Sequence, residues 1–139
     1  LKRAEPVFAN LVEMAENHQV KIAFENIFDD RPDNLALLLN SVNSKMVGIC
    51  LDVGHFNVFS QVRMQAWLET LGEHIFELHL HDNDGNGDQH IAIGDGNFNF
   101  GPISSWLKAI APEERPQLTL ELTHKTHVIK SVNQVKSWF

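Results

Sequence analysis

The sequence predicts an α/β fold, a parallel (β/α) barrel of the TIM type to which this chain contributes about four βα units. Helical and strand-like hydrophobic patterns alternate along the chain, which indicates a parallel sheet covered by helices. Each strand-like segment is also apolar on one face and small or polar on the other. An open sheet with helices on both sides would be apolar on both faces, whereas a barrel carries its helices only outside.

The helices are predicted from apolar residues that recur at helical spacing. They are expected at residues 4–17, 34–42, 60–71, 102–111 and 126–138. The first shows the pattern clearly, with apolar side chains at Val7, Phe8, Leu11, Val12 and Ala15. A turn with good helix-start chemistry precedes the second, and Pro102 suits the first turn of the fourth.

The strands are predicted from short apolar stretches at residues 21–27, 46–53, 75–82 and 117–123. Successive strand residues point to opposite faces, so each strand divides into two sets. The set expected against the helices comprises Ile22, Phe24, Val47, Ile49, Leu51, Phe76, Leu78, Leu80, Leu118, Leu120 and Leu122. The other set is small or polar and is expected to line the barrel interior.

The length of the chain sets a limit on this architecture. A TIM barrel takes roughly 250 residues and eight strands, and this chain has 139 residues. We therefore expect residues 1–139 to form one domain that is half of a barrel. Because an isolated half would leave two open sheet edges, we expect it to pair with another chain or with a missing N-terminal half.

Composition narrows the class of protein. The net charge is −7, with 11 Lys and Arg against 18 Asp and Glu, which argues against nucleic acid as a partner. No apolar run approaches the ~20 residues of a membrane span, and no signal peptide is visible. The single cysteine fits a reducing compartment. We expect a cytoplasmic protein without a membrane segment.

A set of four metal-binding side chains lies near the ends of the four strands. Glu25, Asp52, His79 and Glu121 share the polar set of their strands, so they are expected to meet at the C-terminal mouth. Three carboxylates and one imidazole suit Mn²⁺, Mg²⁺, Co²⁺ or Zn²⁺. Glu25 and Glu121 are also the candidate catalytic residues.

A second group of candidate ligands follows from the loops. Gly54 permits a sharp turn after the second strand, which lets His55 face the mouth together with Asp52. Asp88 and His90 lie in the long polar loop at residues 83–101, and loops of this length are often functional. His55, Asp88 and His90 therefore form a possible second metal site.

His81 is a further candidate from the third strand. It shares the strand face of His79, so we expect it, together with His55, to contact substrate.

The sequence resembles the C-terminal half of the xylose isomerase-like TIM barrels, which include sugar isomerases and epimerases and the family 2 AP endonucleases. The resemblance runs from about residue 20 onward. It rests on Phe24-Glu25-Asn26, Leu51-Asp52-Val53-Gly54-His55, His79-Leu80-His81-Asp82-Asn83, Asp88-Gln89-His90, Gly94-Asp95-Gly96 and Leu120-Glu121. It implies that Glu25, Asp52, His79 and Glu121 match the shared metal ligands.

The resemblance also implies a role for the second group. His55, Asp88 and His90 match an extra zinc site of the endonucleases. Those enzymes usually carry arginine where this chain has Gln89, which weakens the nuclease interpretation.

Three functions remain open. The first is a divalent-metal-dependent isomerase or epimerase of a small sugar or polyol. The metal would stabilise the charge of an ene-diolate, Glu25 and Glu121 would move protons, and His55 and His81 would orient substrate hydroxyls. The second is zinc-dependent hydrolysis of phosphodiester bonds at abasic DNA. The third is an inactive half-barrel assembly unit.

Overall fold

The computed structural model describes residues 5–139, which form one parallel sheet with helices. The strands are β1 (Ile22–Glu25), β2 (Val47–Asp52), β3 (Ile75–Leu80) and β4 (Gln117–Leu120). The helices are α1 (Glu5–His18), α2 (Asp33–Val42), α3 (Val53–Phe59), α4 (Met64–Leu71), α5 (Gly101–Ala109) and α6 (Lys125–Lys136). Two short 3-10 helices, η1 (Gly72–His74) and η2 (Pro112–Glu114), precede β3 and β4.

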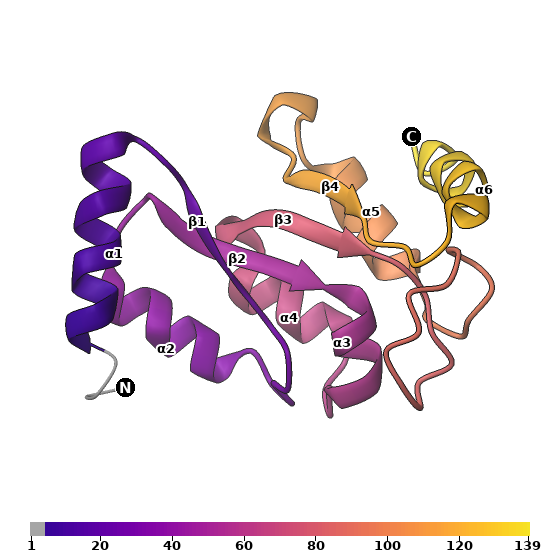
Figure 1. The fold of residues 1–139 in the computed structure, drawn as a ribbon, viewed down its shortest axis with the longest axis horizontal. Coiled ribbons are helices and arrows are strands. Elements are labelled where there is room, and N and C mark those ends of the chain that lie inside the picture. Colours follow the sequence, from indigo (N-terminus) through magenta and orange to yellow (C-terminus); the bar gives the residue numbers. More distant parts are fainter. Residues whose placement is uncertain (1–4) are drawn as a thin grey trace.

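The sheet order follows the sequence order, β1-β2-β3-β4, and every pairing is parallel. In Figure 1 the strands run side by side, with α2 and α4 along one side of the sheet. Helix α2 contacts α4, which in turn contacts α5, so consecutive helices form one layer. The predicted α/β fold of repeated βα units is confirmed.

The hydrophobic core lies between the sheet and this helical layer. From β2, Ile49 and Leu51 are fully buried, and from β3, Leu78 and Leu80 are fully buried as well. Trp67 of α4 packs in the same cluster with no exposed surface. Burial of each such aliphatic side chain stabilises the fold by about 1.5–3 kcal/mol. The expected apolar face of the central strands is therefore the face that the helices cover.

The structure differs from the prediction at Phe76, which was expected on the helix side. Ile49 pairs with Ile75 while its neighbour Cys50 pairs with Glu77, so β3 contains one extra residue at this point. Such a bulge reverses the expected alternation locally. Ile75 therefore joins the buried core, and Phe76 lines a cavity on the opposite, inner face.

Gly48 makes room for this arrangement. A Cβ atom at Gly48 would lie 2.6 Å from the ring of Phe76 and 2.5 Å from the carbonyl oxygen of His74. The Nζ atom of Lys21 lies 4.5 Å from the centroid of the same ring. The ring of Phe76 therefore contacts both the glycine backbone and a cation.

The predicted helix at residues 60–71 is wrong in its first part. Two helices replace it, because α3 begins directly after β2 and α4 begins only at Met64. Asp52 caps α3, since its Oδ1 atom accepts the backbone N–H of His55 at 2.7 Å. Ser60 ends this helix in an extended conformation, and its hydroxyl accepts the indole N–H of Trp67 at 3.0 Å.

The sheet is open at both ends. Within residues 5–139, β1 pairs only with β2 and β4 pairs only with β3. Three apolar side chains around β1 are exposed, namely Val20, Ile27 and Phe28. In the same range, no helix has the length and apolar character needed to cross a bilayer. The sheet thus covers its outer face with helices and leaves its edges unpaired.

Candidate metal centre

The four predicted ligands come from the C-terminal ends of four different strands. Glu25 is the last residue of β1 and Asp52 the last of β2. Asp52 pairs in register with His79 of β3, and Glu121 follows β4 directly. Parallel strands end at the same edge of the sheet, so these side chains lie at one mouth, as expected.

The donor atoms of the four side chains converge. The Nδ1 atom of His79 lies 3.0 Å from Oε2 of Glu121, 3.7 Å from Oε1 of Glu25 and 3.7 Å from Oδ2 of Asp52. All four donors lie within 4.8 Å of one another. In a flat sheet β1 and β4 would be about 14 Å apart, three strand spacings. The edges are therefore brought together by sheet curvature and by the reach of the two glutamates.

This arrangement fits a single divalent ion. Ligands around an octahedral Mg²⁺ are about 3.0 Å apart when adjacent, and those around a tetrahedral Zn²⁺ about 3.4 Å. The Nδ1 atom of His79 is buried and makes no hydrogen bond of acceptable geometry. Three carboxylates around it would repel one another without a cation. The donor set suits Mn²⁺, Mg²⁺, Co²⁺ or Zn²⁺.

Asp52 is the buried anchor of the set. Its carboxylate has no exposed surface, and the Nε2 atom of His81 lies 3.1 Å from Oδ1 and 3.0 Å from Oδ2. Burial alone would raise the pKa of Asp52, but the hydrogen bond and charge of His81 and the backbone N–H of His55 lower it below its ordinary value. Asp52 is thus held as a carboxylate.

His81 lies behind Asp52. Its side chain is fully buried, and its ring stacks on that of His90 with centroids 3.9 Å apart. A Cβ atom at Gly54 would lie 2.0 Å from Cε1 of His81, so glycine is required there for packing. The predicted contact of His81 with substrate stays a prediction, while its contact with Asp52 is direct.

Asn26 belongs to the site and was missed from the sequence. It is almost fully buried. Its Oδ1 atom accepts the backbone N–H of Asp52 at 2.7 Å, and its Nδ2 atom donates to the carbonyl of Asp52 at 3.0 Å. The only signal in the sequence is an amide residue that follows a candidate ligand, in Glu25-Asn26.

The second predicted group also comes together, around one carboxylate oxygen. Oδ2 of Asp88 lies 3.2 Å from Nε2 of His55 and 2.8 Å from Nε2 of His90. On the far side of each ring, Nδ1 faces a carbonyl oxygen, that of Asn26 for His55 and that of Glu121 for His90. Both nitrogens of each ring therefore face acceptors, which favours the doubly protonated imidazolium.

The pKa values of these histidines follow the same geometry. Burial would lower the pKa of His55, but the charge of Asp52 and the carbonyl of Asn26 raise it above its ordinary value. Burial would likewise lower the pKa of His90, and its hydrogen bond to Asp88 raises it. The raised pKa values favour protonated rings around Asp88 in the metal-free protein, and a metal ion here stays a prediction.

The long loop that carries Asp88 and His90 is fixed by Asp82. The backbone of Asp82 exchanges two 3.0 Å hydrogen bonds with Ile91. Its buried carboxylate accepts the backbone N–H groups of Gly94 at 2.9 Å and Phe98 at 3.2 Å. His90 adopts a φ of +49°, which is unusual for a residue other than glycine. The loop is therefore an ordered support for the second group.

A cavity of about 460 Å³ lies on the inner face of the sheet next to the four-ligand centre. Glu25, Cys50, Glu77 and His79 contribute to its wall. Burial, followed by the charges of Glu77, Glu25 and other carboxylates, raises the pKa of the Cys50 thiol to about 12. The thiol is therefore protonated at neutral pH when no cation is near.

Two proteins of unassigned function are similar in sequence. A protein of Methanocaldococcus jannaschii is 35% identical over 109 residues, 73% of this chain and 37% of that protein. A protein of Sinorhizobium fredii is 30% identical over 114 residues, 77% of this chain and 35% of that protein. The matched region therefore spans about a third of the length of these relatives.

Two solved structures are similar in fold and sequence. A D-tagatose 3-epimerase-like protein superposes with a TM-score of 0.79 at 30% identity, covering 94% of this chain and 51% of that chain. The TTHB071 protein from Thermus thermophilus, soaked with ZnCl2, superposes with a TM-score of 0.75 at 26% identity, covering 99% and 53%. The chain spans about half the length of both.

The sequence profile of one family covers nearly the whole chain, from residue 1 to residue 137. This match agrees with the parallel βα units and with the four ligands at the strand ends. The chain belongs to the xylose isomerase-like TIM barrel family.

Proposed function

We propose that this chain supplies the metal centre of a divalent-metal-dependent isomerase or epimerase that acts on a small sugar or polyol. One observation carries the proposal: the two glutamates of the centre are accessible and come from opposite edges of the sheet. The side chains of Glu25 and Glu121 are 33% and 45% exposed, whereas that of Asp52 is fully buried. The two glutamates are therefore placed to meet both an ion and a substrate.

Epimerisation of a carbon next to a carbonyl group needs this kind of pair. A proton leaves one face of the carbon and another proton arrives on the opposite face, so a pair of acid–base groups on opposite sides suits the reaction. Glu25 takes the proton from one side and Glu121 delivers a proton from the other, or the reverse for the opposite epimer. An ion bound by the four ligands would polarise the neighbouring substrate oxygens.

Two histidines contact carboxylates of the centre: His55 contacts Glu25, and His81 contacts Asp52. The Nδ1 atom of His55 lies 3.3 Å from Oε1 of Glu25, and its partly exposed ring is the candidate to orient a substrate hydroxyl. The role of His81 is to hold Asp52 in place, since both oxygens of that carboxylate face its Nε2 atom. Substrate contact through His81 would require the ring to move.

The proposal includes a partner for the open sheet. Similar structures are about twice as long as this chain, and β1 and β4 both lack an outer neighbour within residues 5–139. We infer that another half-barrel, from a second chain or from an N-terminal segment, pairs with these edges. Sedimentation analysis tests this, and a stable monomer of 15.8 kDa with full activity would contradict it.

Deuterium exchange tests the chemistry. The protein is stripped with a chelator, reloaded with Mn²⁺, Co²⁺, Mg²⁺ or Zn²⁺ and incubated in D₂O with a panel of ketoses, aldoses and polyols. NMR is expected to show a new epimer or isomer that carries deuterium at the reacting carbon. In Glu121→Gln both signals should fall by about 10²–10⁴-fold, while the exposed control Glu73→Gln should match the wild type. Undiminished turnover in Glu121→Gln would refute the role.

A zinc-dependent endonuclease is the second candidate, favoured by the contact of His55 and His90 with Asp88. Against it, Gln89 is turned into its own loop, where its side-chain oxygen accepts the backbone N–H of Asp84 at 2.9 Å. Elemental analysis separates the two: one ion per chain favours the isomerase, and three zinc ions with cleavage of abasic DNA favour the nuclease. Metal binding without any turnover would indicate an assembly unit.

A further inference from the structure

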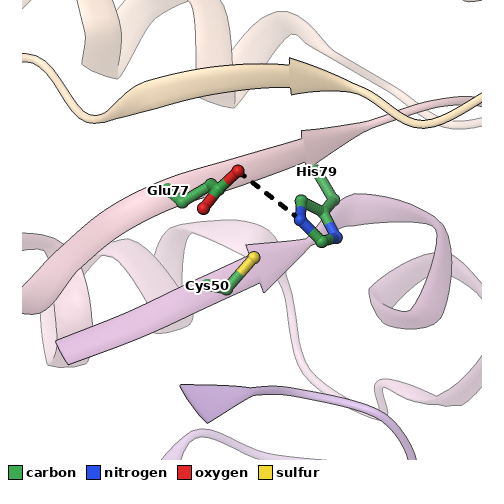
Figure 2. Close-up of side chains that lie close together, drawn as sticks. All are labelled: Cys50, Glu77 and His79. Carbon is green, nitrogen blue, oxygen red and sulfur yellow. Dashed lines mark ion pairs between the residues drawn. The ribbon is translucent and has the colours of Figure 1, made fainter. Parts of the chain in front are cut away.

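A second group of metal-binding donors lies beside the proposed centre, on the inner face of the sheet. It consists of Cys50, Glu77 and His79, which point toward one another from β2 and β3 (Figure 2). Cys50 and Glu77 are direct partners in the β2–β3 register, and one donor atom from each residue lies within 4.8 Å of the others. Two adjacent strands thus present three different ligand types to one point.

Each donor is held in place. The thiol of Cys50 is buried and makes no hydrogen bond within the part of the chain that the structure describes. Oε1 of Glu77 accepts hydrogen bonds from the side-chain amide of Gln117 at 3.1 Å and from the hydroxyl of Thr119. Nε2 of His79 lies 3.6 Å from the same oxygen. Glu77 is therefore held by hydrogen bonds and Cys50 by burial, while His79 is placed by its strand.

The distance between Glu77 and His79 matches coordination of one ion. Donors around a tetrahedral Zn²⁺ lie about 3.4–3.6 Å apart for Zn–N, Zn–O and Zn–S bonds of ordinary length. At 3.6 Å the contact is too long for a hydrogen bond. The cavity of about 460 Å³ borders all three residues, so an ion and a water ligand have room.

Charge also favours a cation at this point. Glu77 adds a fourth carboxylate to a face that already holds Glu25, Asp52 and Glu121. Within residues 5–139, no lysine or arginine lies within ion-pair distance of Glu77. One thiolate, one carboxylate and a neutral imidazole together neutralise one divalent ion. The thiolate selects soft ions such as Zn²⁺ and Cd²⁺ over Mg²⁺ and Mn²⁺.

We propose that Cys50, Glu77 and the Nε2 atom of His79 form a second site for a soft divalent ion, and that this site competes with the four-ligand centre for His79. A neutral imidazole has one nitrogen lone pair, and Nδ1 faces the first centre. An ion on Nε2 leaves the proton on Nδ1, so the first centre loses a ligand, and the thiol proton of Cys50 passes to solvent. The competition rests on the proposed function; the binding of a soft ion does not.

Cobalt spectroscopy tests the site directly. Chelator-stripped protein is titrated with Co²⁺ alone, because an ion already bound at the four-ligand centre would hold His79 through Nδ1. Cys50 is the only cysteine in the chain, so a near-ultraviolet thiolate-to-cobalt charge-transfer band reports on this site. We expect one such band per chain in the wild type, none in Cys50→Ala, and at least a roughly 10-fold weaker cobalt affinity in Glu77→Gln. Glu73→Gln is the matched control, because it removes an exposed carboxylate nearby.

Two outcomes would overturn the proposal. A wild-type protein without a charge-transfer band would show that the thiol binds no ion. A band whose cobalt affinity is unchanged in Glu77→Gln would show binding by the thiol alone. Circular dichroism verifies that each variant is folded, and Glu77→Gln keeps the test informative if Cys50→Ala does not fold.

Displacement of the first ion by Cd²⁺ tests the competition between the two sites separately. In protein loaded with Mn²⁺ or Mg²⁺, added Cd²⁺ should displace the activating ion, measured by the paramagnetic signal of released Mn²⁺. In Cys50→Ala about 10-fold more Cd²⁺ should be needed for the same release, and equal release would contradict the competition. Both readouts are independent of turnover, so an inactive protein with an intact cobalt band would refute the proposed function and leave the soft-ion site standing.

Discussion

The two central strands and the two edge strands contribute differently to the same metal centre. Every residue of β2 is buried, whereas none of β1 or β4 is. The central strands supply Asp52 and His79, which are supported by buried side chains on both flanks. The edge strands supply Glu25 and Glu121, which are accessible. The comparison indicates that the candidate centre is anchored in the middle of the sheet, and that the proposed proton transfers would take place at its edges.

Breaking the central anchor should have the largest effect on stability. Both carboxylate oxygens of Asp52 lie within hydrogen-bond distance of Nε2 of His81, in a fully buried contact. Asp52→Asn replaces this carboxylate by an amide. A hydrogen bond to a buried charged group contributes about 1.5–3 kcal/mol, and we expect a loss within this range in metal-free protein, partly offset by weaker repulsion among the carboxylates of the centre. Urea unfolding measures it. A variant as stable as the wild type would show that the pair is not an anchor.

Substitution of Gly54 should disturb the contact between Asp52 and His81 through the ring of His81. Alanine at Gly54 would place a methyl group 2.0 Å from Cε1 of His81, so Gly54→Ala should push that ring away from Asp52. Overpacking of this kind costs about 1–3 kcal/mol. The temperature of thermal unfolding and the metal affinity should both fall. As a control, Gly87→Ala adds a methyl group where no heavy atom lies within 4 Å, and it should leave both unchanged.

The pH dependence of the metal-free protein should separate the anchor from the loop. The pKa of His90 is raised in the folded state, so its stabilisation is complete below the ordinary value of 6.5 and disappears as pH rises through the folded value. The pKa of Asp52 is lowered, so its stabilisation is present above 3.8 and disappears as pH falls through the folded value. Stability should therefore be greatest between these limits.

Thermal unfolding across pH measures this dependence. His90→Gln should reduce the slope of the alkaline side of the stability curve, to which His55 with its raised pKa also contributes, while leaving the acidic side in place. If the alkaline side kept its slope in this variant, His90 would not be its source.

The edge strands should show the smallest effect on stability. In Glu25→Gln the altered side chain is one-third exposed, so the free energy of unfolding should change by less than about 0.5 kcal/mol. Metal affinity, in contrast, should fall by at least the roughly 10–100-fold that is typical when a supporting group is lost. Isothermal titration measures the affinity. A large stability loss without loss of metal binding would reverse the proposed division of roles.

The parallel βα fold and the convergence of the four candidate ligands could be predicted, because both follow from residue patterns along the chain. Glu25, Asp52, His79 and Glu121 keep the same strand parity, and parallel strands place equal parities on one face. Phe76 could not be placed correctly because both it and Ile75 are apolar, so the sequence does not reveal where the extra residue enters.

Features that depend on packing could not be predicted from the sequence. Helix α3 has only seven residues, and its start is determined by the capping of Asp52. The role of His81 behind Asp52 depends on the absence of a side chain at Gly54, which is only visible in three dimensions. The sequence therefore predicts which residues gather at the mouth, but not which of them support the others.

The side-chain amide of Asn26 connects the end of edge strand β1 to the backbone of Asp52. β1 is only four residues long and has one neighbour, and the two hydrogen bonds between Asn26 and the backbone of Asp52 extend its ladder by one further rung. Any pull that a docking half-barrel exerts on this edge is therefore transmitted to Asp52. If the proposed half-barrel docks there, its assembly at the rim would also align the candidate ligands.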